Sequence, residues 1–414
     1  MVPNGWKLKK LNDVFKVIDS LHQTPTFSDT GLPMVRVTDV KGGILNLSNT
    51  VKVSEKVFSE YTKKYTPKKH DIVFSRVGSY GISSYVDSNE PFCLGQNTVI
   101  AESNDNAVSK YIFNVLKSTY VKRQIERTVD GSSHKTVSLK VIRALDIPIP
   151  PLPEQRKIAQ ILSTWDRGIA TTEKLIEASK QQKKALMQQL LTGKKRLVDP
   201  ETGKAFEGEW EEVKLANICS KITDGAHHSP ASVEEGFPMY SVKDMGKSGF
   251  KKGTARLIGK EDYLCLEQQN CRPLINDILI AKDGSILKHC FVMEKQCDGV
   301  ILSSIAILRP DLEKICPAFV AHFLSQDYVK KYVAKVFTTG SGVPRIVLKD
   351  FKSIKLKLGS LAEQKKIASV LTTADKDIEL LETKLAHLKL EKKSLMQQLL
   401  TGKRRVQVAE TEAA

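Results

Sequence analysis

The sequence predicts a mixed α/β protein in which two similar globular domains alternate with two long helices. The nonapeptide LMQQLLTGK occurs at residues 186–194 and again at 395–403, which indicates an internal duplication. Each copy closes a stretch with heptad spacing of apolar residues. Each stretch follows a block of short apolar runs separated by turn residues. We expect the two helices to pair as an antiparallel coiled coil, with the halves related by a pseudo-two-fold axis.

The length and charge favour a multidomain protein with a polyanionic partner. A chain of 414 residues with 41% hydrophobic residues can form more than one core. Lys and Arg total 64 against 47 acidic residues, for a formal net charge of +17. This excess favours a nucleic acid partner, and a basic surface without a specific partner is the alternative. The sequence contains no long apolar run and no N-terminal apolar segment, so we expect a cytoplasmic protein with no membrane contact.

The motif content gives no catalytic or metal-binding pattern. The seven cysteines form no CxxC pair, so we expect small buried thiols in a reducing compartment and no metal. An [N/D]-P-P-[YFW] motif, which holds the flipped base in adenine methyltransferases, is absent, and so is G-x-G-x-x-G. The segment MGKSG (245–249) has Ser241 where a phosphate-binding loop needs its first glycine. We therefore expect a non-catalytic chain that binds no cofactor.

The duplication extends through the chain and sets the expected domain boundaries. LPEQRKIAQILSTWD (152–166) aligns with LAEQKKIASVLTTAD (361–375), and HDIVFSRVGS (70–79) aligns more weakly with NDILIAKDGS (276–285). The expected segments are a first globular domain (1–151), a helix (152–194), a linker (195–208), a second globular domain (209–358), a closing helix (359–405) and a flexible tail (406–414).

Both helical stretches have a heptad seam with steps of four and three over about five heptads. Pro153 and Glu154 suit the start of the first helix, and Gly193 and Gly402 suit the left-handed position after each end. The seam residues are Ile158, Leu162, Trp165, Ile169, Ile176, Leu186 and Leu190 in the first helix, and Ile367, Leu371, Ile378, Leu381, Leu385, Leu388, Leu395 and Leu399 in the second.

Lys183 and Lys392 interrupt the two seams at the same place. A lysine in a seam can fix the register of the pair, or it can extend to solvent at a fraying end, and the sequence leaves both alternatives open.

Each globular block is predicted to be a mixed α/β domain with a twisted sheet. Short apolar runs such as MVRVTDV, DIVFSR and NTVIAE are typical of strands. The stretches SKYIFNVLKSTYVKRQIE and CPAFVAHFLSQDYVKKYVAKVF, late in the two blocks, are typical of helices.

Three loops that match between the halves carry groups suited to DNA contact. The first combines a cation with a Gly-Ser turn, which can approach phosphates through backbone N–H groups. The second has Gln-Asn in one half and Ser-Ser in the other, and an amide can pair with adenine. The third is a Gly-Ser loop followed by a cation. Ordinary turns, local backbone contacts and connectors are the alternatives.

These loops give the candidate DNA-binding residues. In the first half they are Arg76, Gly78, Ser79, Gln96, Asn97, Ser132, Ser133, His134 and Lys135. In the second half they are Lys282, Gly284, Ser285, Ser303, Ser304, Ser341 and Arg345, and His227 and His228 form a further polar loop candidate.

This pattern resembles the specificity subunits of type I restriction–modification systems. The resemblance rests on two variable blocks that end in PPLPEQRKIA or GSLAEQKKIA and continue into a helix closing with LMQQLLTGK, and it covers the whole chain. It implies two target recognition domains, each reading one half of a bipartite double-stranded DNA site. It implies that the conserved helices dock methyltransferase subunits, which would use S-adenosylmethionine. Methylation, translocation and cleavage would belong to methyltransferase and restriction subunits.

Two expectations follow for the assembly. The near-repeated outer faces of the helices predict two copies of one methyltransferase subunit per chain. The seam from Ile158 to Leu190 covers about 50 Å at 1.5 Å per residue. At about 3.4 Å per base pair this spans roughly 14 base pairs, and leaves a gap of roughly 5–8 unread base pairs between half-sites.

The residues alone leave two other functions open. One is a stand-alone nucleic-acid enzyme such as a nuclease, and the other is a coiled-coil adaptor that binds RNA or protein. DNA cleavage or methylation by the purified chain would favour the first. A preference for RNA, or binding without salt dependence, would favour the second.

Overall fold

The computed structural model describes residues 2–78, 80–129, 136–284, 286–337 and 345–408. Its contacts divide the chain into two compact units. The first unit is Met1–Glu173 with Thr383–Ala414, and the second unit is Lys174–Glu382. Each unit therefore contains one globular domain, the start of one long helix and the end of the other.

The described residues of the first unit form three small sheets. The four-stranded sheet has the order β2 (Lys16–Asp19), β8 (Thr98–Glu102), β5 (Ile72–Ser75), β6 (Ser83–Tyr85), with all neighbours antiparallel. The three-stranded sheet has the order β4 (Val51–Val53), β3 (Leu32–Val35), β7 (Cys93–Leu94), and β3 runs parallel to β7. The third sheet pairs β1 (Lys7–Lys10) with β9 (Asp146–Ile149).

The second unit repeats this topology strand for strand. Its four-stranded sheet has the order β11 (Cys219–Asp224), β17 (Ile305–Pro310), β14 (Ile278–Ala281), β15 (Cys290–Val292). Its three-stranded sheet has the order β13 (Arg256–Ile258), β12 (Phe237–Tyr240), β16 (Val300–Ile301), again with one parallel pair. The third sheet pairs β10 (Glu211–Lys214) with β18 (Lys355–Leu358). The mixed α/β class and the duplication are confirmed.

The sequence predicted one twisted sheet per block, whereas the described residues of each block form three small sheets, and one predicted strand is shorter than its apolar run. The apolar run MVRVTDV is a strand only as far as Val35, because residues 36–39 turn into the 3-10 helix η1 (Val37–Asp39). The Asp39 carboxylate accepts a hydrogen bond from the Arg36 amide at 2.9 Å, which stabilises the turn. Its counterpart in the second unit is η2 (Val242–Asp244).

The predicted late helix of each block is two helices. In the first unit these are α3 (Ser109–Leu116) and α4 (Thr119–Val129), and in the second they are α9 (Pro317–Ser325) and α10 (Asp327–Phe337). Shorter helices complete the domains: α1 (Leu11–Val14), α2 (Glu55–Thr62), α5 (Leu139–Arg143), α7 (Leu215–Ile218), α8 (Lys260–Gln268) and α11 (Leu348–Ser353).

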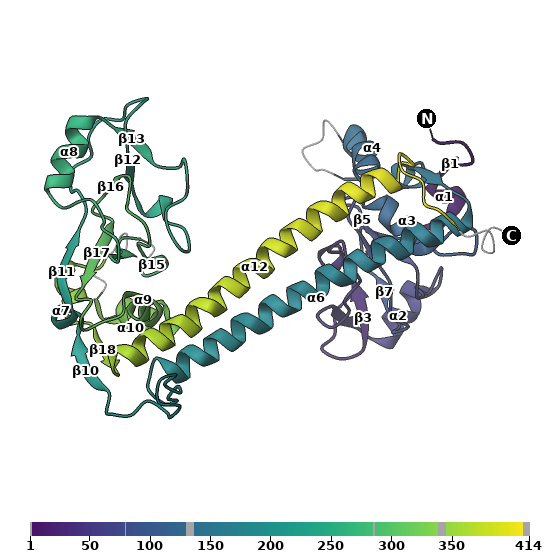
Figure 1. The fold of residues 1–414 in the computed structure, drawn as a ribbon. Coiled ribbons are helices and arrows are strands. Elements are labelled where there is room, and N and C mark those ends of the chain that lie inside the picture. Colours follow the sequence, from purple (N-terminus) through teal and green to yellow (C-terminus); the bar gives the residue numbers. More distant parts are fainter. Residues whose placement is uncertain (1, 79, 130–135, 285, 338–344, 409–414) are drawn as a thin grey trace. The chain divides into compact units, whose positions relative to one another are not determined.

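The two long helices, α6 (Leu152–Leu190) and α12 (Leu361–Leu399), contain 39 residues each. Gly193 and Gly402 follow their ends with φ of 70° and 69°, as predicted. In the first unit the start of α6 lies beside the end of α12 (Figure 1). There Lys389 of α12 pairs with Glu173 of α6 and Lys392 pairs with Asp166, so the helices run antiparallel. In the second unit Lys180 pairs with Glu382 and Lys183 pairs with Asp375, in the same sense.

Ion pairs account for the lysine in each seam. Lys392 is only 7% exposed and donates to Asp166 of the facing helix. Lys183 lies 2.6 Å from both oxygens of Asp375. Each lysine lies about one heptad or more inside its helix, so the pairs favour a role in fixing register over a fraying end. All seam residues named above are buried or half-buried.

The repeated Glu-Gln pair fastens the start of each long helix to its domain. Glu154 is buried, accepts from the indole of Trp6 at 3.1 Å and accepts two hydrogen bonds from Arg405 at 2.7 Å. Gln155 accepts from the Val108 amide at 2.8 Å and so holds the residue before α3. The Glu154 carboxylate at the start of α6 is therefore a buried hydrogen-bond acceptor and not a solvent-facing group.

The second unit has the same set of hydrogen bonds at the start of α12. Glu363 accepts from the Trp210 indole at 3.0 Å and from Arg196 at 2.7 and 2.8 Å. Gln364 accepts from the Cys316 amide at 3.0 Å. A Cβ at Gly359 would collide with Trp210 and Glu363, so this close approach requires glycine.

The cores of the two domains include the helix ends. Ile158 and Leu162 of α6 join Leu399 and Leu400 in the main core of the first unit. Ile367 and Leu371 of α12 join Leu190 and Leu191 in the main core of the second unit. Each domain is therefore completed by residues from two distant parts of the chain.

Candidate nucleic-acid interface

The three candidate loops of the first unit meet through backbone hydrogen bonds, within the residues that the structure describes. The Arg76 amide, just after β5, donates to the Asn97 carbonyl at 3.0 Å. The Val137 amide donates to the Arg76 carbonyl at 2.8 Å, and Val77 forms an isolated β-bridge with Thr136. Loops some 20 and 60 positions apart in sequence are thus joined at one end of the four-stranded sheet.

The second unit joins its loops in the same way. The Lys282 amide donates to the Ser304 carbonyl at 3.0 Å, and the Ile346 amide donates to the Lys282 carbonyl at 3.1 Å. Asp283 forms a β-bridge with Arg345. The segments that match between the halves therefore lie together in each unit, although the sequence comparison did not predict their contact.

The cations of the first loop are held in ion pairs within the protein. Arg76 donates to both oxygens of Asp19, on β2, at 3.1 Å and to the Val137 carbonyl at 3.1 Å. The Lys282 ammonium lies 2.9 Å from Asp224, and both side chains are less than a tenth exposed. A neutralised, buried cation is a poor phosphate contact. The ion pairs give both cations a role in positioning the loops, and contact of either cation with DNA stays a prediction.

Each of these aspartates also contacts an exposed histidine. The ring of His22 lies 3.0 Å from Asp19, and the ring of His227 lies 3.1 Å from Asp224. His227 was a sequence candidate, and its counterpart His22 was missed. The signal was present, because DSLHQ (19–23) aligns with DGAHH (224–228) at both the aspartate and the histidine. His228 is exposed next to His227.

The remaining described candidates lie at the surface of this cluster. Gly78 and Gly284 are exposed and have φ of 66° and 68°, and a Cβ on Gly78 would meet no atom within 4 Å. The left-handed backbone at both positions favours glycine. Gln96 is exposed and its side-chain oxygen accepts from the Thr24 hydroxyl at 3.1 Å.

Residues of the second candidate loop are half-buried in both units. Asn97 is half-buried with a φ of 63°, and Ser303 and Ser304 are half-buried at the matched place. Arg345 is 62% exposed and lies 3.1 Å from Asp283. An exposed pair of this kind is weak, so the guanidinium is available to a stronger anion.

Seven candidates lie outside the described residues: Ser79, Ser132, Ser133, His134, Lys135, Ser285 and Ser341. Contact with DNA stays a prediction for all of the candidate loops.

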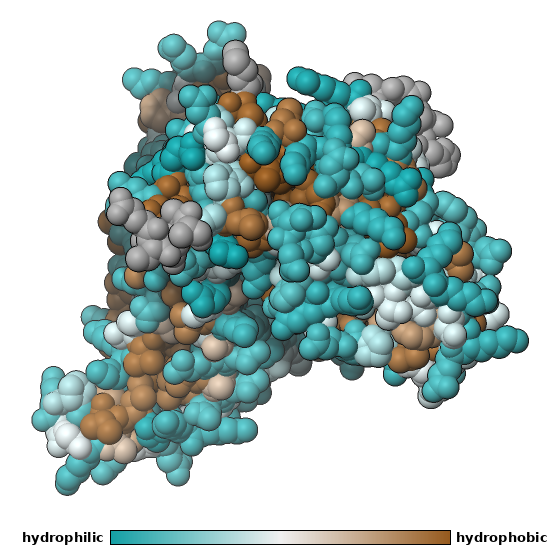
Figure 2. Space-filling model, turned by 90° about the vertical axis from the view of Figure 1, so that its right-hand side faces the viewer, coloured by the Kyte–Doolittle hydropathy of each residue, from teal (hydrophilic) through white to brown (hydrophobic). Residues whose placement is uncertain are grey.

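The chemistry of the clustered groups is that of recognition. They offer backbone N–H groups, amides, hydroxyls, imidazoles and one exposed guanidinium, which are hydrogen-bonding groups that proteins use on DNA. In the part of the chain that the structure describes, no group of three or more His, Cys, Asp or Glu could hold a metal ion. The face drawn in Figure 2 is mainly hydrophilic, with hydrophobic residues in patches between polar ones.

The cysteines are free thiols. Burial raises the pKa of Cys93, Cys219 and Cys290 to about 12 and that of Cys297 to about 11. These thiols stay protonated near neutral pH and are poor nucleophiles. Cys265 is exposed, so the expectation of uniformly buried thiols was wrong for this residue. Among the described residues, no helix combines the length and apolar character that a membrane span requires.

Comparison with known families decides the identity of the duplicated domain. The model of the type I restriction modification DNA specificity domain matches residues 3–181 and again residues 207–390. The chain belongs to this family. Both matches run from a globular domain into a long helix, as the repeat in the sequence does.

Relatives within the type I specificity family cover nearly the whole chain. The type I restriction enzyme MjaVIII specificity subunit of Methanocaldococcus jannaschii is 27% identical over 425 residues, covering 98% of this chain and 94% of the relative. The fold is similar to the crystal structure of the type I S subunit from M. genitalium, with a TM-score of 0.60, 18% identity, and coverage of 97% of this chain and 98% of that one.

A second solved structure has the same fold. It was determined to describe complex assembly and conformational transition of the type I R-M system. The TM-score is 0.57 at 20% identity, with coverage of 98% of this chain and 100% of that chain. The protein is a type I restriction–modification specificity subunit with two recognition domains.

Proposed function

We propose that the two domains of this subunit each read one half of a bipartite, gapped double-stranded DNA target. One observation carries this proposal: both units build the same cluster from three loops, and the cluster differs in side chains between the units. Gln96 and Asn97 in the first unit are replaced by Ser303 and Ser304 in the second. Amides and hydroxyls prefer different base edges, so the same framework would read different sequences.

The long helices are the proposed docking surface for partner proteins. Two adenine methyltransferase subunits would bind, because the outer faces of α6 and α12 are near repeats. Restriction and translocase subunits would join the full complex. Methylation with S-adenosylmethionine, translocation and cleavage would be carried out by these partners, and this chain would contribute recognition without catalysis or a cofactor of its own.

The recognition proposal is tested by domain exchange. Residues 1–151 are replaced by the same block of a relative, and DNA from cells expressing the chimera with its methyltransferase is analysed by modified-base sequencing. We expect one half of the methylated sequence to change, while the other half and the gap stay, because distant contacts contribute independently. The reciprocal exchange of residues 209–358 should change only the other half.

Two results would reject the proposal. One is a simultaneous change of both half-sites, and the other is a moved gap although both helices are intact. The partner proposal has a separate measurement, which is the mass of the purified complex. One methyltransferase copy per chain, or none, would contradict it.

A further inference from the structure

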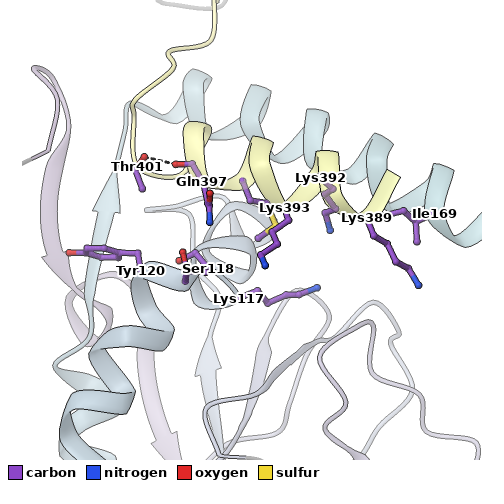
Figure 3. A pocket seen from close by; sticks show the side chains of 11 residues that line it. Lys117, Ser118, Tyr120, Ile169, Lys389, Lys392, Lys393, Gln397 and Thr401 are labelled. Carbon is purple, nitrogen blue, oxygen red and sulfur yellow. Dashed lines mark hydrogen bonds between the residues drawn. The ribbon is translucent and has the colours of Figure 1, made fainter. Parts of the chain in front are cut away.

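A lysine-lined pocket of 370 Å³ lies in the first unit where the turn between α3 and α4 faces the end of α12. Figure 3 shows Lys392 and Lys393 extending from α12 toward the turn at Lys117. Ile169 of α6 and Met396 of α12 supply apolar lining. The volume is typical of cavities that receive a ligand or a side chain.

Two of the four lysines in this pocket lack an acidic partner. Lys392 pairs with Asp166, and Lys389 pairs with Glu173 at 2.7 Å. Within the described ranges, no carboxylate pairs with Lys117 or Lys393. Burial of its ammonium, followed by repulsion from Lys392, lowers the pKa of Lys117, and the charge of Asp166 acts in the opposite direction. A bound anion would relieve this repulsion.

The second unit has a matching pocket of 500 Å³ that already contains a carboxylate. Lys184, the counterpart of Lys393, lies 2.9 Å from Asp327 at the start of α10. The residue at the position of Asp327 in the first unit is Thr119. The second repeat thus shows where a carboxylate sits in such a pocket, and the first repeat leaves that place open.

The position of the first pocket separates it from the candidate DNA-binding loops. The pocket lies at the beginning of α4, whereas Gly81, in the first candidate loop, faces Ile125 toward the end of that helix. The 11 residues of α4 span about 15 Å. Apolar lining by Ile169 and Met396 is also unsuited to a phosphate, which proteins bind with cations, hydroxyls and backbone N–H groups.

We propose that this pocket receives an acidic side chain, next to an apolar residue, from the methyltransferase subunit. The inference rests on the proposed function, because it assigns a contact within the docking surface formed by α6 and α12. Lys117 and Lys393 bind the carboxylate, and Ile169 and Met396 contact the apolar neighbour. Asp327 fills the matching place in the second unit, so the two docking sites on one chain are chemically unequal.

The test moves the internal carboxylate between the units. Thr119→Asp gives the first pocket the residue of the second, and Asp327→Thr makes the reverse exchange. Full-length chains are titrated with the methyltransferase subunit, and bound copies are counted by native mass spectrometry. We expect Thr119→Asp to weaken binding of one copy by roughly tenfold or more, and Asp327→Thr to weaken neither. Lys393→Glu should act like Thr119→Asp, and Lys56→Glu on α2 is the control with the same charge change.

The outcomes separate the inference from the proposed function. The wild-type chain is expected to bind two copies of the methyltransferase subunit. If the Thr119→Asp and Lys393→Glu variants bind both copies as tightly as the wild-type chain does, the inference is wrong and the docking proposal stands. If the wild-type chain binds no methyltransferase, both are wrong. Affinity of the isolated chain for DNA is measured in parallel. A drop in that affinity with unchanged methyltransferase binding would identify a phosphate site and overturn the inference.

Discussion

The Arg405 guanidinium donates two hydrogen bonds, both 2.7 Å long, to the buried carboxylate of Glu154, 251 positions earlier in the chain. The same guanidinium donates to the Asn4 carbonyl at 3.0 Å. Three segments that are far apart in sequence therefore meet at the start of α6. Arg196 makes the corresponding contacts with Glu363 and the Gly208 carbonyl in the second unit.

Arg405→Ala should destabilise the first unit selectively. Glu154 is buried but the Arg405 side chain is 46% exposed, so solvent screening should reduce the cost below the about 3–5 kcal/mol of a fully buried pair. Hydrogen exchange measured by mass spectrometry should show faster exchange in the first unit, and Arg196→Ala should have that effect in the second. Lys10→Ala, which breaks the exposed pair with Asp146, is the control and should cost less than about 1 kcal/mol. If Arg405→Ala increased the rate of hydrogen exchange equally in both units, the assignment of this contact to the first unit would be contradicted.

Asp19→Ala should weaken recognition by the first unit alone. Arg76 would lose two charge-assisted hydrogen bonds, at a cost of about 1.5–3 kcal/mol, and the joined loops would shift. We expect roughly tenfold weaker binding to DNA, measured with oligonucleotides in which one half-site is scrambled at a time. Asp224→Ala should affect the other half-site. Asp87→Ala, at an exposed position, is the control. If Asp19→Ala weakened binding to both half-sites, the assignment of one loop cluster to one half-site would be wrong.

His322 should make the second unit sensitive to acid. Burial, followed by the charge of Lys183, lowers its pKa to about 4 from an ordinary 6.5. At pH 7 the imidazole is neutral in the folded unit and mostly neutral in the unfolded chain. As the pH falls from 6.5 toward 4, the unfolded chain gains a proton that the folded unit excludes, so stability falls by up to about 3 kcal/mol.

The matched variant for this effect is His322→Asn, because the first unit has Asn114 at the same place. The free energy of unfolding is measured by urea denaturation from pH 4 to 7.5. The loss between pH 6.5 and 4 should be smaller in the variant than in the wild type. Parallel curves for both proteins would show that His322 does not titrate on unfolding.

The recognised DNA should contain a gap of roughly 5–8 unread base pairs. The expectation follows from the seam of α6, at about 1.5 Å per residue, compared with about 3.4 Å per base pair. Methylome sequencing of cells that carry the active system gives the target directly. A contiguous methylated sequence would contradict the use of helix length to set the spacing.

The long helices were the most predictable part of the fold. A heptad period and a terminal glycine are local signals, so the seam and both ends follow from the sequence without knowledge of the domains. The break between α3 and α4 at Lys117 and Ser118 was missed, because it contains neither Gly nor Pro. Ser118 accepts a hydrogen bond from the Val121 amide and so caps the start of α4, a local signal that the prediction of one continuous helix did not use.

The sequence selected the candidate loops by matching the halves, but it did not predict that these loops meet or that Arg76 and Lys282 form ion pairs. The partner of Arg76 is Asp19, 57 positions earlier, and no local pattern shows that the pair is formed. Comparing the halves once more at Asp19 and Asp224 would have shown that each keeps an aspartate followed three residues later by a histidine.

The division of the first unit between two distant segments determines the order in which the protein can fold during synthesis. The second unit, Lys174–Glu382, is continuous in sequence, and the first unit needs Thr383–Ala414 to complete its core. At roughly 5–20 residues per second, the ribosome needs about 10–40 s to make the intervening segment. During this time Ile158 and Leu162 lack the Leu399 and Leu400 side chains that cover them in the finished protein. The domain that is synthesised first is therefore the last to be completed.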